Sequence, residues 1–421
     1  MKPNVAVIGG GWAGCAAALT LAEAGVAVTL HEASRTLGGR ARAVEIEGEA
    51  LDNGQHILLG AYAQTLQLID RLLPEAEGLW RLPLSLDQPP EFSLACPRLP
   101  APLHLLAGLL GARGLSWGEK FAAARGAQAL LNNATTPDTL SVSQLTRSQP
   151  EKLNRLLWHP LCVSALNTPP DIASARVFRD VLCAAFGGRN HDSDLLLPRR
   201  DLTALFPAPA TERIRKLGGE VRLASRVTSI EATHAAVTLG TREALANYSH
   251  VILAVAPQHL SALTAQVPEL DAASRAVDAY DYQPIATGYV QVDPVFRLAK
   301  PMYALANGPA QFVFDRGQSH GQSGLLAFVA SAAANLQADW LDQAEAQLRR
   351  IVDPGTVRWR RRIVEKQATY ACVPGMARPG IRTVHPRIFL AGDYTAGSYP
   401  ATLESATSSG VQSAGALLEQ L

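Results

Sequence analysis

Residues 5–41 read VAVIGGGWAGCAAALTLAEAGVAVTLHEASRTLGGRA, and this stretch carries the strongest indication of fold class in the sequence. It begins with an entirely apolar run, Val5–Ile8, which predicts a strand in the middle of a parallel sheet with both faces covered. The alanine-rich segment that follows predicts a helix that ends at Gly25, and residues 26–30 predict a second strand. The stretch therefore predicts a strand, a helix and a second strand in immediate succession.

Three glycines and one acid occupy the positions that a dinucleotide needs in such a unit. Gly9, Gly11 and Gly14 form the pattern G-x-G-x-x-G directly after the first strand. Gly9 permits the tight turn, Gly11 lets the backbone approach a pyrophosphate, and Gly14 lets the helix pack close to the sheet. The helix N-terminus faces the phosphates, and Glu32, 18 positions after Gly14, accepts the ribose hydroxyls. Glycine-rich turns also occur for structural reasons alone, but this order of elements predicts dinucleotide binding.

Composition excludes several other classes of protein. The chain has 421 residues, which favours two domains, and its 38 basic and 37 acidic residues leave no overall field to attract nucleic acid. Its five cysteines form no CxxC pair, so we expect reduced thiols and a cytoplasmic location. No group of residues has metal-ligand spacing, and we expect no metal. No apolar run is long enough for a spanning helix, which leaves at most attachment to one face of the cytoplasmic membrane.

Two further motifs indicate that the dinucleotide is a flavin cofactor and not a nicotinamide cofactor. A second group of glycines, Gly38-Gly39, is followed directly by Arg40. Gly39 and Arg40 are placed to wrap around the far side of the pyrophosphate, and the Arg40 guanidinium can donate a charge-assisted hydrogen bond to it. Near the other end of the chain, a predicted strand ends in Gly392-Asp393, and a helix rich in small residues begins at Pro400. With both motifs, the chain resembles the flavin-dependent amine oxidase and phytoene desaturase superfamily.

The resemblance implies FAD as cofactor and a particular set of contacts. Gly392 and Asp393 would contact the ribityl chain. The helix N-terminus at Thr402 and Leu403 would point at the pyrimidine edge of the flavin, whose reduced form tends to be anionic there. The backbone around Val227 would meet the adenine, although the sequence explains Val227 equally well as a core residue.

The resemblance also implies a Rossmann-like α/β FAD-binding domain assembled from discontinuous segments, residues 1–57, 200–257 and 376–421. Residues 58–199 and 258–375 lack nucleotide-binding signals, and we expect them to form an inserted α+β substrate-binding domain.

Residues 98–113 of this second domain are strongly apolar and interrupted by proline, with Arg98 and Arg113 at the two ends. Such a segment is too short to span a bilayer. It either contacts one face of a membrane or forms a core helix that lines a substrate tunnel.

Gly54, Gln55 and His56 follow the second glycine pair closely, and the topology brings them near the isoalloxazine ring. His56 is our first candidate for a proton donor, because an imidazolium is accessible near neutral pH. A ring that only hydrogen-bonds the flavin or a nearby carbonyl explains His56 as well. Tyr399, close to the flavin-facing helix, is the second candidate donor, and packing alone would also account for it.

Residues 51–62, 158–170 and 400–404 resemble the hydroxysqualene dehydroxylase branch of the superfamily, which serves bacterial hopanoid pathways. This branch implies a long isoprenoid allylic alcohol as substrate and squalene as product. Loss of water would leave an allylic cation, which a hydride from N5 of the reduced flavin would quench. The sequence has no second dinucleotide fingerprint, so a docking reductase or NAD(P)H would supply the electrons.

Three alternatives would use the same scaffold. A carotenoid or phytoene-type desaturase would run the flavin chemistry in the oxidative direction. A flavin amine oxidase fits less well, because residues 285–292, which correspond to the strand that carries a lysine in amine oxidases, contain no lysine. The third alternative is a lipid-binding flavoprotein without redox activity.

Overall fold

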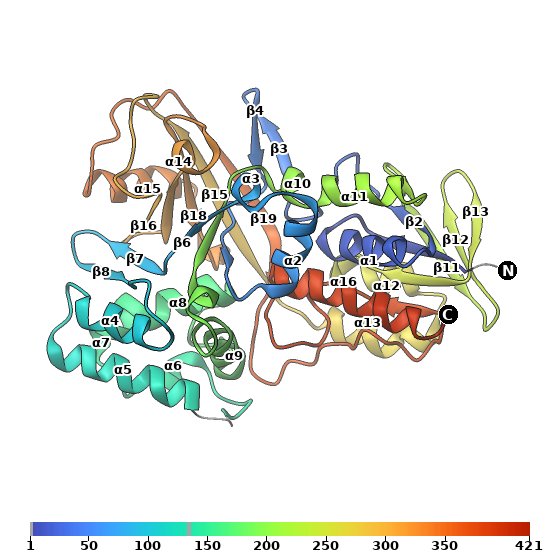
Figure 1. Ribbon diagram of the computed structural model, residues 1–421, viewed down its shortest axis with the longest axis horizontal. Helices are drawn as coiled ribbons and strands as arrows, with labels where there is room; N and C mark the ends of the chain where they lie inside the picture. Colours follow the sequence, from blue (N-terminus) through green and yellow to red (C-terminus); the bar gives the residue numbers. More distant parts are fainter. Residues whose placement is uncertain (1–2, 133–135) are drawn as a thin grey trace.

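The computed structural model of the protein describes residues 3–132 and 136–421. Figure 1 shows an elongated molecule in which both chain ends lie in the same half. Helices α4 (Leu103–Gly111) and α5 (Trp117–Asn132) lie at the opposite end. Within the described residues, no helix is both long enough and apolar enough to cross a membrane.

A five-stranded parallel sheet forms the centre of the half that holds the chain ends, with strand order β10-β2-β1-β14-β20. Its members are β1 (Asn4–Ile8), β2 (Ala27–His31), β10 (Glu220–Arg222), β14 (His250–Leu253) and β20 (Ile388–Leu390). Three distant parts of the chain therefore share one sheet. The domain limits expected from the sequence stay predictions, because nothing tests them residue by residue.

Both faces of this sheet are covered, which explains the apolar strands. Helices α1 (Trp12–Glu23), α11 (Pro207–Lys216) and α16 (Leu403–Leu418) pack on one face. The other face packs against α12 (Leu260–Thr264), α13 (Asp271–Asp278) and a three-stranded antiparallel sheet. That sheet comprises β11 (Val227–Ala232), β12 (Val237–Thr241) and β13 (Leu245–Tyr248).

Glycine is required where the chain passes from β1 into α1. Gly9 has φ +110°, and a Cβ there would lie 2.4 Å from the carbonyl oxygen of Ala254. A Cβ on Gly14 would lie 1.8 Å from the carbonyl oxygen of Gly9. No side chain fits either space, so these glycines allow the tight turn and the close approach of the helix.

The C-terminal helix α16 lies along α1 at a distance that also excludes side chains. A Cβ on Gly410 would lie 2.2 Å from the carbonyl oxygen of Ala13. The small residues of both helices are therefore a packing requirement, and they bring the N-termini of the two helices to the same region of the sheet edge.

A second five-stranded sheet, antiparallel with order β16-β17-β18-β15-β19, dominates the other half (Figure 1). Its strands are β15 (Tyr282–Gln291), β16 (Met302–Ala304), β17 (Phe312–Asp315), β18 (Leu325–Ala330) and β19 (Trp359–Tyr370). Helix α15 (Trp340–Arg349) covers one face, where Trp340 and Leu341 pack against Val313 and Phe328. Strand alternation turns Phe312, Phe314 and Val329 to the opposite face.

Shorter elements connect and cover these layers. The small strands are β3 (Ala43–Ile46), β4 (Glu49–Asp52), β5 (Leu58–Leu59), β6 (Leu79–Leu82), β7 (Ser85–Gln88), β8 (Phe92–Ala95) and β9 (Leu195–Pro198). The remaining α-helices are α2 (Ala63–Leu72), α3 (Glu75–Gly78), α6 (Val142–Thr146), α7 (Glu151–Leu153), α8 (His159–Leu166), α9 (Ala175–Phe186), α10 (Leu202–Leu205) and α14 (Arg316–His320).

Candidate functional site

A cavity of about 850 Å³ lies between the central parallel sheet and the antiparallel sheet. One end is formed by the turn after β1, the end of β2 and the N-terminus of α1. The other end is formed by residues of β15, β17 and β18. Segments from the beginning, the middle and the end of the chain therefore meet around a single space.

The end of the cavity beside β1 and β2 presents bare backbone and one acid. Gly9, Gly11 and Gly39 line it, and a Cβ on Gly39 would lie 3.3 Å from the Cα of Gly11. Glu32 lines the same end, and its Oε2 accepts a hydrogen bond of 2.7 Å from the backbone N–H of Gly10. Uncovered backbone next to an acid fits the phosphates and the ribose of a dinucleotide.

Val227 and Gly14 were also predicted to belong to the dinucleotide site, but only Val227 lines the cavity. Val227 begins β11, is half-buried and lines the cavity, so its contact with adenine stays a prediction. Gly14 is not part of the lining. It lies behind the turn against Gly9, where it lets α1 pack closely, which is the role that the sequence suggested.

Two helices begin at the cavity wall, α1 at Trp12 and α16 at Leu403. Thr402 and Leu403 both line the cavity, and the Thr402 hydroxyl caps α16 by accepting a hydrogen bond of 3.1 Å from the backbone N–H of Ser405. The first N–H groups of a helix lack intrahelical acceptors, and the macrodipole makes this end positive. Each helix start therefore favours negative charge, such as a phosphate or an anionic ring edge.

One ion pair joins the N-terminal and C-terminal motifs. Arg40 Nη2 lies 2.6 Å from Asp393 Oδ1, and Arg40 Nη1 donates a hydrogen bond of 2.7 Å to the carbonyl of Ala368. Arg40, Asp393 and Gly392 all line the cavity. Burial is the largest single effect and lowers the pKa of Arg40, but the charge and hydrogen bond of Asp393, together with Glu365 and Tyr282, leave that pKa above its ordinary value. The guanidinium expected at the pyrophosphate is thus charged and anchored to the ribityl motif.

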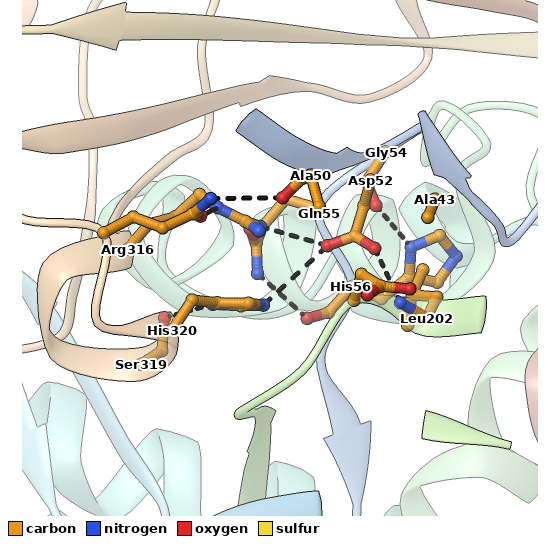
Figure 2. Close-up of polar contacts among 12 residues, drawn as sticks. Ala43, Ala50, Asp52, Gly54, Gln55, His56, Leu202, Arg316, Ser319 and His320 are labelled. Atoms are coloured by element: carbon orange, nitrogen blue, oxygen red, sulfur yellow. Dashed lines mark hydrogen bonds and ion pairs between the residues drawn. The ribbon is translucent and has the colours of Figure 1, made fainter. Parts of the chain in front are cut away.

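A buried network holds the segment of residues 54–56 from behind (Figure 2). Arg316 of α14 is fully buried, and its Nη1 donates to Asp52 Oδ2 at 3.0 Å and to Gln55 Oε1 at 2.9 Å. The other carboxylate oxygen of Asp52 accepts the backbone N–H of Leu202 at 2.7 Å. Because Gln55 lines the cavity, the network fixes a side chain of the site from the far side.

Asp52 has two further polar neighbours, His320 and Tyr289. His320 Nε2 lies 3.8 Å from Asp52 Oδ2, and Tyr289 donates a hydrogen bond of 2.8 Å to the Asp52 carbonyl. Burial, followed by the charge of Arg316, lowers the pKa of His320 to about 3, so this ring is neutral. Burial raises the pKa of Asp52, and Arg316 opposes that rise. The guanidinium is therefore the partner that most favours the ionised form of Asp52.

His56 lines the cavity together with Gly54, and its Nδ1 lies 2.7 Å from the Gly54 carbonyl oxygen (Figure 2). A carbonyl only accepts, so this bond fixes the proton on Nδ1. Burial lowers the pKa of His56, and the Gly54 carbonyl and Asp52 only partly oppose that effect. At neutral pH the ring is therefore neutral, with a lone pair on Nε2, and Nε2 donates a proton only after the ring has gained one.

Tyr399 lies outside the set of residues that line the cavity. Its hydroxyl donates a hydrogen bond of 3.1 Å to the carbonyl of Ala61, and its ring packs edge-on against Tyr62 with centroids 5.7 Å apart. Burial raises the pKa of Tyr399 to about 12. These contacts match the packing role that the sequence left open, and its role as a proton donor stays a prediction.

The substrate end of the cavity carries a group of apolar side chains. Ile285, Phe312, Phe314 and Val329 come from the antiparallel sheet, and Leu166 of α8 faces the same space. Over the described part of the chain, no lysine lines the cavity. The wall therefore suits a hydrocarbon better than an amine.

Three polar residues at the site were not predicted from the sequence. Arg316 holds Gln55, as described above. Glu365 of β19 lines the cavity and accepts a hydrogen bond of 3.0 Å from the Asn53 amide. Arg378 donates to the carbonyls of Asp393 (2.9 Å) and Tyr399 (2.7 Å), which secures the loop before α16. None of these residues belongs to a motif, so no local signal could have indicated them.

Comparison with known proteins identifies the scaffold. The model of the family described as flavin containing amine oxidoreductase matches residues 12–418. The chain belongs to this family. Membership makes the protein an FAD-dependent oxidoreductase, as the sequence predicted. The bare glycines, the acid and the two helix N-termini fit that cofactor at the nucleotide end of the cavity.

Individual proteins of known name are similar to this chain over almost its whole length. The chain is 25% identical to the hydroxysqualene dehydroxylase of Sinorhizobium fredii, over 100% of this chain and 99% of the relative. It is 26% identical to a chloroplastic/chromoplastic 15-cis-phytoene desaturase of an Oncidium hybrid cultivar, over 99% of this chain and 78% of the relative. A solved structure of a putrescine oxidase triple mutant has a TM-score of 0.77 at 18% identity, covering 100% of this chain and 99% of that chain. This last likeness confirms the predicted α/β FAD-binding fold.

Proposed function

We propose that the enzyme catalyses the reductive dehydroxylation of hydroxysqualene to squalene, in the cytoplasm and for hopanoid or related isoprenoid synthesis. The observation that carries this proposal is the composition of the cavity. One end is built for a dinucleotide, the other is an apolar wall for a long hydrocarbon, and no lysine lines it within the described residues. Full-length similarity to a hydroxysqualene dehydroxylase supports the same assignment.

The overall change breaks the carbon–oxygen bond of the allylic alcohol and forms one carbon–hydrogen bond. The oxygen leaves as water, which requires one proton from the protein or solvent. Reduced FAD, when bound, supplies the hydride for the carbon. Two electrons must then return to the cofactor from NAD(P)H or from a docking reductase.

The residues of the chain prepare the substrate for this change. Phe312, Phe314 and Val329 would hold the polyene and keep water away from the carbon that loses its hydroxyl. His56 would accept a hydrogen bond from the hydroxyl in its neutral form and donate the proton from Nε2 after protonation. Arg316 would keep Gln55 in place beside it.

A carotenoid or phytoene-type desaturase is the second candidate, because the apolar wall also suits a longer polyene and a phytoene desaturase is among the relatives. It differs in direction, since desaturation removes electrons from the substrate. Amine oxidation lacks support, because no lysine of the described residues reaches the cavity.

Anaerobic spectroscopy distinguishes these functions. The reduced enzyme is mixed with hydroxysqualene, and the oxidised enzyme is mixed with phytoene, while flavin absorbance is recorded. The proposal predicts return of the oxidised spectrum with hydroxysqualene and no bleaching with phytoene. Bleaching by phytoene alone would establish the desaturase instead.

A further inference from the structure

Large apolar side chains are exposed together on α4 and on the start of α5. These helices lie at the end of the molecule opposite the chain termini (Figure 1). On α4, His104 and Gly108 are buried, whereas Leu103, Leu106 and Leu110 are 53%, 46% and 43% exposed. These leucines are spaced by three and four residues, so they form one stripe along the helix. The stripe is unusual because the outer face of a surface helix is normally polar.

Helix α5 extends this stripe. Trp117 and Phe121, one turn apart, are 64% and 63% exposed. Lys120 connects the two helices, because its Nζ donates a hydrogen bond of 2.7 Å to the Leu110 carbonyl and lies 4.8 Å from the centre of the Trp117 ring. Leu103, Leu106, Leu110, Trp117 and Phe121 therefore form one continuous surface, called here the apolar face.

The segment that carries the apolar face is rich in positive charge. Residues 98–125 contain four basic side chains and one acidic side chain, although the whole chain has a formal net charge of only +1. The basic residues are Arg98, Arg113, Lys120 and Arg125. The one acid is Glu119. Its Oε2 lies 3.8 Å from Lys152 Nζ, so the positive charge of Lys152 offsets its negative charge. Apolar side chains that enter lipid, bordered by cations that meet phosphates, are typical of helices that lie in a membrane interface.

None of the residues from 98 to 125 lines the 850 Å³ cavity, so the tunnel-lining alternative for residues 98–113 finds no support in the part of the chain that is described. We propose that the apolar face binds the surface of a bilayer rich in anionic phospholipid. This proposal rests on the proposed function for its purpose, because hydroxysqualene and squalene reside in lipid. Its physical basis, exposed leucines and aromatics in a segment rich in basic residues, does not depend on which isoprenoid is turned over.

Sedimentation of the holoenzyme with vesicles tests the proposal. The vesicles contain equal amounts of phosphatidylcholine and phosphatidylglycerol, and vesicles of phosphatidylcholine alone serve as comparison. We expect binding to the anionic vesicles, weakening with salt, and at least tenfold weaker binding for the double variant Leu106→Glu/Leu110→Glu and for Trp117→Glu. Leu245→Glu is the matched control, because Leu245 of β13 is 74% exposed at the other end of the molecule and its variant should bind normally.

Two outcomes would overturn the proposal. One is undiminished vesicle binding by the double variant. The other is sedimentation velocity that shows a dimer converted to monomer by the same substitutions, since a second copy would then cover the apolar face. Turnover of detergent-solubilised hydroxysqualene, measured separately, should be unchanged in the variants. Failure of all variants and the unaltered enzyme in that assay would count against the proposed function and leave vesicle binding to be judged on its own.

Discussion

Arg40 and Asp393 stand 353 positions apart in the chain, yet Arg40 Nη2 lies 2.6 Å from Asp393 Oδ1. Each residue belongs to a separate flavin motif, and both line the same cavity. The contact therefore shows how the two ends of the chain form one cofactor site. It also links the two motifs, because the charge of each residue is offset by the other.

Arg40→Met should weaken FAD binding by about tenfold or more, because removal of one member of a mostly buried charge pair leaves the other uncompensated. Retention of FAD after gel filtration and the dissociation constant from flavin fluorescence would measure the effect. Arg71→Met is the matched control, since Arg71 pairs with Glu23 on the surface, away from the cavity. Normal FAD affinity of the Arg40 variant would contradict this account of the site.

Asp52→Asn should lower the free energy of unfolding by roughly 3–5 kcal/mol, because it leaves the fully buried Arg316 without a counter-charge. Urea unfolding of the holoenzyme measures the change. Asp342→Asn, which breaks an exposed ion pair with Arg360, should cost about 1 kcal/mol or less. A small effect at Asp52 would show that the network in Figure 2 is not a main support of residues 54–56.

The packing of α16 on α1 gives a comparison within one helix. Gly410→Ala should destabilise the protein by about 1–3 kcal/mol, because its Cβ would overlap the Ala13 carbonyl. Gly415→Ala has open space around the new Cβ and should be neutral or stabilising by up to about 1 kcal/mol through helix propensity. Thermal unfolding of both variants tests the contrast, and equal melting temperatures would rule it out.

His56 gives the pH prediction. Burial holds its pKa below the ordinary 6.5, so the protonated ring that donates from Nε2 becomes more abundant as the pH falls. The rate of the dehydroxylation step should therefore rise on acidification from pH 8 and level off only once the pH falls below that lowered pKa. His56→Ala should lose this dependence and about 10²–10⁴-fold of the rate, as is usual for a general acid. Full turnover by a His56→Ala enzyme with full FAD occupancy would eliminate His56 as the donor.

The local parts of the fold were predictable from sequence, and the long-range parts were not. The glycines at positions 9, 11 and 14 follow an apolar run, and each has a steric reason that the sequence pattern reveals. Thirteen of the predicted site residues line one cavity, with only Gly14 and Tyr399 outside it. The family motifs predicted that these residues share one site. No local sequence pattern connects residue 40 with residue 393.

Other features depend on tertiary packing and could not be read from the sequence. Arginine is rarely fully buried, so nothing marked Arg316 as an internal residue. The His56 ring was expected to be accessible as an imidazolium, but burial by the surrounding segments lowers its pKa. Residues 98–113 gave the same apolar signal for a tunnel wall and for a membrane contact. The exposure of the leucines and the absence of these residues from the cavity lining favour the second.

In the proposed reaction, two electrons pass from the cofactor of this enzyme to hydroxysqualene. The most direct measurement is a single turnover without oxygen, in which enzyme carrying a known amount of reduced FAD is mixed with excess hydroxysqualene and the squalene formed is counted. We predict one squalene for each FAD that becomes oxidised. Hydroxysqualene recovered intact, with the flavin still reduced, would contradict the proposal.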